Sequence, residues 1–166
     1  ARRSSDLRLN WFDSIPLIED SGRYTMNSLA TGPNHAYKIA SANPHEWYIL
    51  EYRNTSDTFD SSIPNRGMLI WRYNDLPTAD NAMFNANDTV NQLWLFRPNS
   101  NNDTVNGSPS SAAFGVYNRT HFDSTSNPLP YLCDGTPDNS FSITDIQISS
   151  DQHSVSFTFI PNMSES

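Results

Sequence analysis

Short runs in which apolar and polar residues alternate recur along this chain, and that period of two constrains its fold more than any other feature. Alternation over about four to eight residues is typical of β-strands, because successive side chains point to opposite faces of a sheet. Such runs, bounded mostly by Gly, Pro, Asn or Ser, occupy residues 22–29, 35–41, 46–54, 67–73, 92–98, 141–149 and 153–161. The sequence therefore predicts an all-β fold: a β-sandwich of about seven short antiparallel strands, with a small barrel as the alternative.

The composition agrees with this prediction and narrows the possible partners. Asn, Ser, Thr and Asp dominate the polar residues and there are 11 Pro, which favours turns over helices, so we expect at most one short helical turn, within 77–91. The net charge of -8 argues against nucleic acid or an anionic membrane as partner. The one cysteine, Cys133, cannot form an intrachain disulfide. We expect a bacterial protein that is secreted or lies in the cell envelope.

The chain of 166 residues is long enough for one domain with its own core. We predict a single β-sandwich domain over residues 1–166, with frayed ends at 1–9 and 161–166. The opening residues carry two arginines without an apolar run after them, unlike a signal peptide, and no later segment is long enough to span a membrane. We expect a mature protein or a piece cut from a longer one.

The histidines do not have the spacing of zinc ligands. His45-Glu46 begins like the HExxH motif of zinc peptidases, but the second His is missing and the segment has the pattern of a strand, not a helix. The other histidines, at 35, 121 and 153, show no ligand spacing with each other or with Cys133. We expect no zinc site in this chain.

Two oxygen-rich loops are weak candidates for calcium. The first loop has the sequence PNSNNDTVNGS, residues 98–108. Its oxygen-bearing side chains alternate as in a calcium loop, but no closing Glu follows. The second loop has the sequence CDGTPDN, residues 133–139. The candidate ligands are Asn99, Asn101, Asp103, Asp134 and Asp138. A solvated loop is the alternative interpretation for both.

Glu51 is a charged residue within the strand predicted at 46–54, which is apolar or aromatic on both faces. On a strand, Trp47, Ile49, Glu51 and Arg53 share one face, while Glu46, Tyr48, Leu50 and Tyr52 share the other. Desolvating a lone carboxylate is costly, so such a residue is a catalytic group, a metal ligand or half of an ion pair. An arginine suits an ion pair, because its planar guanidinium can satisfy both carboxylate oxygens.

Ordered motifs across about residues 10–160 resemble the M6 family of secreted bacterial metallopeptidases, the immune-inhibitor-A-like group. That family has a stretch resembling E-Y-(Y/F)-L-L-E-N-R-Q, a loop with F-D-x-x-L-P-x-x-G, and then L-L-I-W-H-V-D. The runs GRYTM, HAYKI and NANDTVN and the final hairpin also resemble family elements. The residues here that match the three main motifs are Glu46, Tyr48, Leu50, Glu51, Arg53, Phe59, Asp60, Pro64, Gly67, Leu69, Ile70 and Trp71.

Two departures limit what the resemblance implies. The HExxH motif of the family lies upstream of this region and is absent from this chain, and Arg72, Tyr73 and Asn74 stand where the family has H-V-D. The resemblance therefore implies the β-rich part that follows the catalytic core, either as a fragment or in a degenerate relative of the family, with zinc only in an upstream domain. It also favours a structural Glu51, paired with Arg53 or Arg72.

We therefore expect a non-catalytic β-sandwich segment of a secreted M6-like peptidase, which packs against or supports the upstream catalytic domain and helps to hold substrate. The alternative is a free-standing cell-envelope module that recognises glycan or protein through exposed aromatics such as Trp11, Trp47 and Trp94, although tryptophans at strand spacings are more often part of a core. An independent hydrolase that uses paired carboxylates is the least favoured expectation.

Overall fold

The computed structural model describes residues 12–28, 35–54, 66–75, 93–98, 111–116, 119–133 and 135–162. They form β1 (Gly22–Asn27), β2 (Ala36–Ala40), β3 (Glu46–Asn54), β4 (Arg66–Asn74), β5 (Leu93–Leu95), β6 (Phe141–Ile148) and β7 (Ser154–Pro161). All pairings between these strands are antiparallel. The predicted all-β fold is confirmed, and each predicted run overlaps one observed strand.

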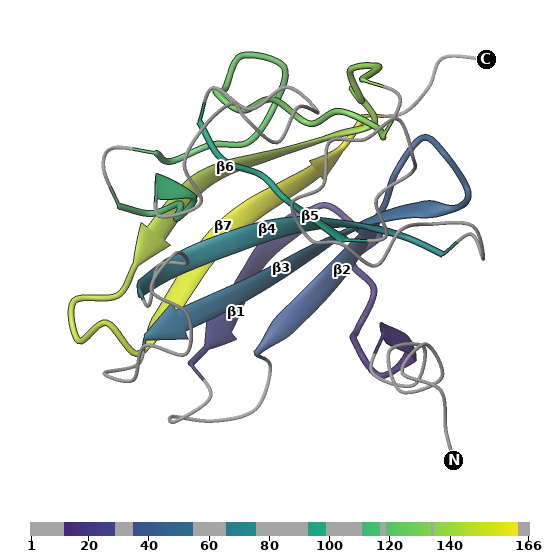
Figure 1. Ribbon diagram of the computed structural model, residues 1–166. Helices are drawn as coiled ribbons and strands as arrows, with labels where there is room; N and C mark the ends of the chain where they lie inside the picture. The colour runs from purple at the N-terminus through teal and green to yellow at the C-terminus, as the bar shows by residue number, and fades with distance from the viewer. Residues whose placement is uncertain are drawn as a thin grey trace.

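The strands form two sheets packed on each other, as Figure 1 shows. One sheet has the order β1-β7-β6, and the other has the order β2-β3-β4-β5. Strands that are consecutive in the sequence lie side by side in the larger sheet. The smaller sheet instead joins distant parts of the chain, because Gly22 in β1 is opposite Phe159 in β7.

The main core lies between the sheets and is rich in aromatic residues. Tyr48, Leu50 and Tyr52 in β3 face Phe157 and other apolar side chains of the smaller sheet, all at most 3% exposed. Aromatic rings meet mostly edge to face, for example Tyr48 and Phe141 at 5.0 Å between centroids. Since each aromatic buries a large area, this chain builds a full core from few hydrophobic residues.

A second apolar cluster covers the outer face of the larger sheet. Phe12 and Ile15 pack there against buried residues of β3 and β4, including Ile49 and Trp71. The Lys38 ammonium donates to Phe12 O at 3.1 Å and lies 4.2 Å from the centre of the Phe12 ring. β4 is therefore buried on both faces, which explains why its sequence is almost continuously hydrophobic.

The predicted ends and loops are described only in part. Pro161 ends β7, and Asn162 N donates to Ser140 O at 2.9 Å, so both residues are paired with the smaller sheet instead of frayed. The other residues expected to fray, 1–9 and 163–166, and the predicted helical turn in 77–91 lie outside the described residues.

Candidate functional site

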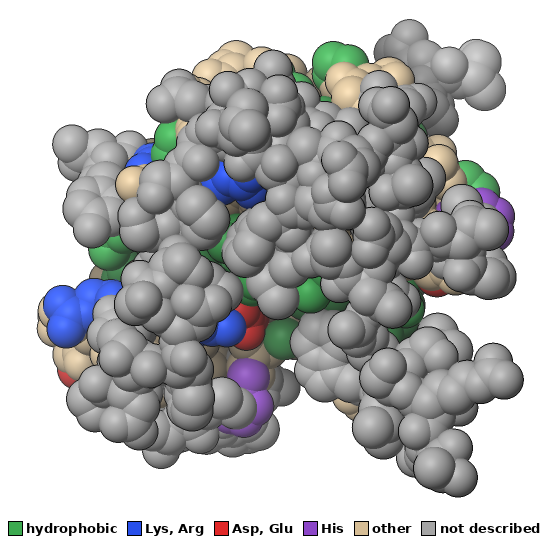
Figure 2. All heavy atoms as spheres, in the orientation of Figure 1, with side chains coloured by type: hydrophobic (Ala, Val, Ile, Leu, Met, Phe, Trp, Pro, Cys, Tyr) green, Lys and Arg blue, Asp and Glu red, His purple; other side chains and the backbone are tan. Residues whose placement is uncertain are grey.

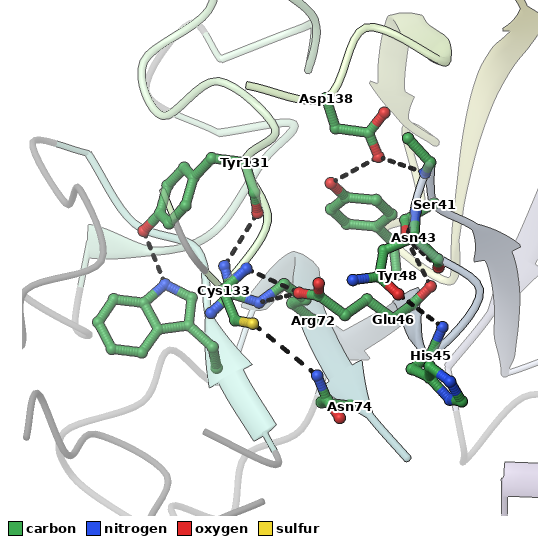
Figure 3. Close-up of polar contacts among 12 residues, drawn as sticks. Ser41, Asn43, His45, Glu46, Tyr48, Arg72, Asn74, Tyr131, Cys133 and Asp138 are labelled. Atoms are coloured by element: carbon green, nitrogen blue, oxygen red, sulfur yellow. Dashed lines mark hydrogen bonds and ion pairs between the residues drawn. The ribbon is translucent and has the colours of Figure 1, made fainter. Parts of the chain in front are cut away.

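A group of polar side chains is enclosed between the sheets where β3 begins and β4 ends (Figure 3). Glu46 and Tyr48 come from β3, and Arg72 and Asn74 come from β4. The register places Glu46 opposite Asn74 and Tyr48 opposite Arg72, so all four side chains share the face that meets the main core. We refer to these four residues, with the buried Tyr131 and Asp138 and the half-buried Cys133, as the buried polar cluster.

Arg72 is the centre of the buried polar cluster and is 0% exposed. Its Nε lies 3.4 Å from Glu46 Oε1, and its Nη1 donates to Tyr131 O at 2.9 Å. The guanidinium also lies 5.4 Å from the centre of the Tyr131 ring and 5.8 Å from that of Trp94. Burial lowers the pKa of Arg72, and the Glu46 carboxylate opposes that effect. The cation is thus held by an acid, a carbonyl and aromatic faces.

Glu46 connects the larger sheet to the segment that contains Cys133. Its Oε1 accepts from Cys133 N at 2.7 Å, while its Oε2 is buried without a hydrogen-bond donor among the described residues. Nearby, Asn74 Nδ2 lies 3.9 Å from Cys133 Sγ, and Trp94 Nε1 donates to Tyr131 Oη at 2.8 Å. These contacts hold residues 131–133 against β3, β4 and β5.

Asp138 is a hydrogen-bond acceptor for three different segments. Its Oδ2 accepts from Tyr48 Oη at 3.0 Å and from Ala42 N at 3.2 Å, and its Oδ1 accepts from Ser140 N at 3.0 Å. The side chain is 1% exposed. Burial and the Asp138 carboxylate together raise the pKa of Tyr48 well above its ordinary value. The other four candidate calcium ligands, Asn99, Asn101, Asp103 and Asp134, lie outside the described residues.

Glu51 lies on the opposite face of β3 from the buried polar cluster. Its Oε1 accepts from Arg53 Nε at 3.2 Å and from Trp71 Nε1 at 2.9 Å. The Glu51 and Arg53 side chains are 29% and 28% exposed. Arg72, the other arginine that we considered as a partner, pairs with Glu46 instead, because residues 46 and 72 share the inner face and residue 51 does not.

The sequence interpretation overlooked Glu46 as the acid of a buried ion pair. Glu46 has the same strand parity as Tyr48, Leu50 and Tyr52, which the alternation assigns to one face. This alternation was the feature of the sequence that could have indicated a buried Glu46. The identity of the partner depends on the register between β3 and β4, which local sequence does not give.

The other ionisable groups of the described residues do not gather into a metal centre. Within the described ranges, no three His, Cys, Asp or Glu side chains lie together so as to hold a metal ion. His45 Nδ1 is 2.9 Å from Asp75 Oδ1, and this pair is at the surface.

Figure 2 shows that the Lys and Arg side chains drawn in blue on this face occur at separate places, not as one basic patch.

Two of the tryptophans considered for sugar stacking are in the described part of the chain. Trp94 is 0% exposed, and Trp47 is half-buried, with its ring 5.5 Å from that of Phe12. Trp11 lies outside the described residues. The described tryptophan rings therefore contribute to the packing of the two apolar clusters.

Comparison with known proteins gives no assignment. No protein-family model, curated protein sequence or solved structure matches the chain. A search of the described residues finds no helix that is long and apolar enough to cross a membrane.

Proposed function

We propose that the chain is a non-catalytic β-sandwich unit of a secreted, bacterial M6-like metallopeptidase, and that it packs against and supports the domain that carries the zinc motif. The ordered motifs along the sequence support this proposal. The two-sheet fold also agrees with the β-rich region that the resemblance implies. The partner is then the upstream domain of the same polypeptide, and zinc belongs to that domain.

The enclosure of Glu46 and Arg72 is the observation that carries the non-catalytic role. The family pattern has Glu at position 46 and His at position 72, and in this fold the two positions lie side by side. Arginine at 72 provides a permanent cation next to Glu46. With 1% and 0% of these side chains exposed, neither meets a substrate, so their effect is on stability.

The test compares the isolated chain with the parent polypeptide. Purified without chelator, the isolated chain should hold far less than one equivalent of zinc and should not hydrolyse casein. The parent polypeptide should bind zinc and hydrolyse casein. The coding sequence upstream should specify an HExxH helix in the same reading frame. Casein hydrolysis by the isolated chain, or an upstream sequence without that helix, would overturn the proposal.

A double variant of the parent polypeptide tests the structural role separately. Glu46→Leu with Arg72→Met removes both charges at similar volume, a change that is often neutral for stability. We expect this variant to fold and to keep most of its casein hydrolysis. A variant that melts like the wild type but is inactive would show that the pair takes part in the reaction.

A further inference from the structure

The edges of the two sheets are protected to different degrees. At the edge of β2, Lys38 N donates to Pro16 O at 2.8 Å and Ile18 N donates to Lys38 O at 2.9 Å. At the edge of β6, Phe122 and Ile143 exchange two hydrogen bonds, of 2.8 and 3.0 Å. β5 is only three residues long. Covering and shortening are the usual means by which proteins keep edge strands from pairing with other chains.

Among the described residues, none covers the edge of β1 in this way. Ser28 N donates to His153 O in the β1–β7 ladder, which fixes the alternation of hydrogen-bonded pairs along β1. By that alternation, the N–H and C=O groups of Arg23 and Thr25 point away from β7. No described residue forms a backbone hydrogen bond with these four groups, which we call the β1 edge. Within the described part of the chain, the β1 edge is therefore open to pairing with a further strand.

The surroundings of the β1 edge indicate which side chains the added strand would carry. Tyr24 and Tyr37, from the adjoining edges of the two sheets, are both half-buried and meet edge to face at 5.7 Å. A strand added about 4.8 Å from β1 would place alternate side chains over these rings, a position suited to apolar residues. Glu19 and Asp20, both exposed, come just before β1 and would attract a basic residue.

We propose that the β1 edge binds an extended, cationic peptide segment of another polypeptide by strand addition. The backbone of Arg23 and Thr25 would pair with the backbone of the peptide, and apolar peptide side chains at every second position would cover Tyr24 and Tyr37. A second copy is a poorer occupant than a cationic peptide, since each copy carries a net charge of -8 and like charges repel. The proposal goes beyond the supporting role and does not depend on it.

The probe is an acetylated and amidated heptapeptide, Lys-Val-Thr-Val-Thr-Val-Lys, with its valines directed to the tyrosines. Fluorescence anisotropy should show saturable binding, and hydrogen exchange at the amides of Arg23 and Thr25 should slow when the peptide is present. In antiparallel pairing, the threonine amides of the peptide face the β1 edge. N-methylation of both threonines should therefore weaken binding at least about tenfold, through lost hydrogen bonds.

A pair of variants at one position provides the matched control. Thr25→Pro removes an N–H that points away from β7 and blocks strand addition, whereas Thr25→Val keeps the N–H. We expect Thr25→Val to bind like the wild type and Thr25→Pro to bind at least about tenfold more weakly, at similar melting temperatures. No saturable binding to the wild type, or equal binding of the N-methylated peptide, would overturn the proposal. A dimer that Thr25→Pro dissociates would also overturn it, by assigning the β1 edge to a second copy.

Discussion

Arg72 Nε lies 3.4 Å from Glu46 Oε1, and the two side chains are 0% and 1% exposed, so this ion pair joins β3 and β4 inside the core. A buried ion pair is often no more stabilising than apolar residues of similar volume. Removing only one of the two charges is strongly destabilising, because the other charge stays buried without a partner. The contrast between single and double substitutions is therefore informative.

Arg72→Met should destabilise the fold by about 3–5 kcal/mol, because it leaves the Glu46 carboxylate buried without its cation. The double variant Glu46→Leu/Arg72→Met should cost less than the single variant, since no buried charge remains. Urea unfolding followed by tryptophan fluorescence measures both values. A double variant less stable than Arg72→Met would contradict this view of the pair.

Glu51→Ala should cost about 1 kcal/mol, well below the value for Arg72→Met. A fully buried ion pair at this position would be expected to cost on the order of 3 kcal/mol. The structure lowers this expectation, because the Glu51 and Arg53 side chains are 29% and 28% exposed and water screens their attraction. The remaining cost comes mainly from Trp71 Nε1, which loses its acceptor. Equal costs for Glu51→Ala and Arg72→Met would contradict the assignment of the buried pair.

Tyr48 should make the fold sensitive to alkaline pH. Its pKa is raised in the folded protein by burial and by Asp138, so above pH about 10 the unfolded chain loses this proton first. Stability from this group is thus fully present below pH 10 and is lost as the pH rises toward the folded pKa. Tyr48→Phe should cost about 1 kcal/mol at pH 7 and reduce the loss of stability between pH 9 and about 11. The urea midpoint of both proteins across this range is the measurement, and parallel curves would contradict the prediction.

Gly67→Ala should destabilise by about 3 kcal/mol, because two costs add. Gly67 has φ 113°, where side chains are strained, and an added Cβ would lie 2.6 Å from Ala113 Cβ. Gly135→Ala is the matched control, since Gly135 also has positive φ (88°) but no described residue lies within 4 Å of its added Cβ. This control should cost about 1 kcal/mol from backbone strain alone. Thermal melts compare the two, and equal shifts would rule out the contact with Ala113.

Calcium removal should change the melting temperature only slightly. The candidate loops lack a closing carboxylate, and Asp138 already accepts hydrogen bonds from Tyr48, Ala42 and Ser140. Melts with calcium and with chelator measure the difference. A rise above roughly 10 °C with calcium would reveal a tight site, because stabilisation grows with the ratio of ligand concentration to dissociation constant.

Much of the fold can be predicted because alternation is a local property. In β7, Val155, Phe157 and Phe159 point into the core and the residues between them point out, as the sequence pattern indicates. The pairing of β1 with β7 has no such local signal, since it depends on how the two sheets are completed. The strand order of the smaller sheet therefore needed the structure.

Some contacts of the candidate site can also be predicted from local sequence, whereas others require the structure. The contact between Glu51 and Arg53 is accessible from the sequence, because residues two apart on a strand share a face. The pairing of Glu46 with Arg72 requires the β3–β4 register. The hydrogen bond from Cys133 N to Glu46 additionally requires an irregular segment to return to the sheet, and its turn-rich sequence does not specify that path.

The pairing of β1 with β7 also means that the strands of the larger sheet are all synthesised before the smaller sheet is complete. The larger sheet uses residues 36–95, so all its strands have left the ribosome before β6 and β7 are made. β1 emerges first, but its ladder partners among the described residues, 154–159 in β7, are made near the end of the chain. Joining strands so distant in sequence is slow, because a long loop must close first. A nascent chain stalled before β7 therefore presents the apolar side of β1 and the inner face of the larger sheet to chaperones and proteases.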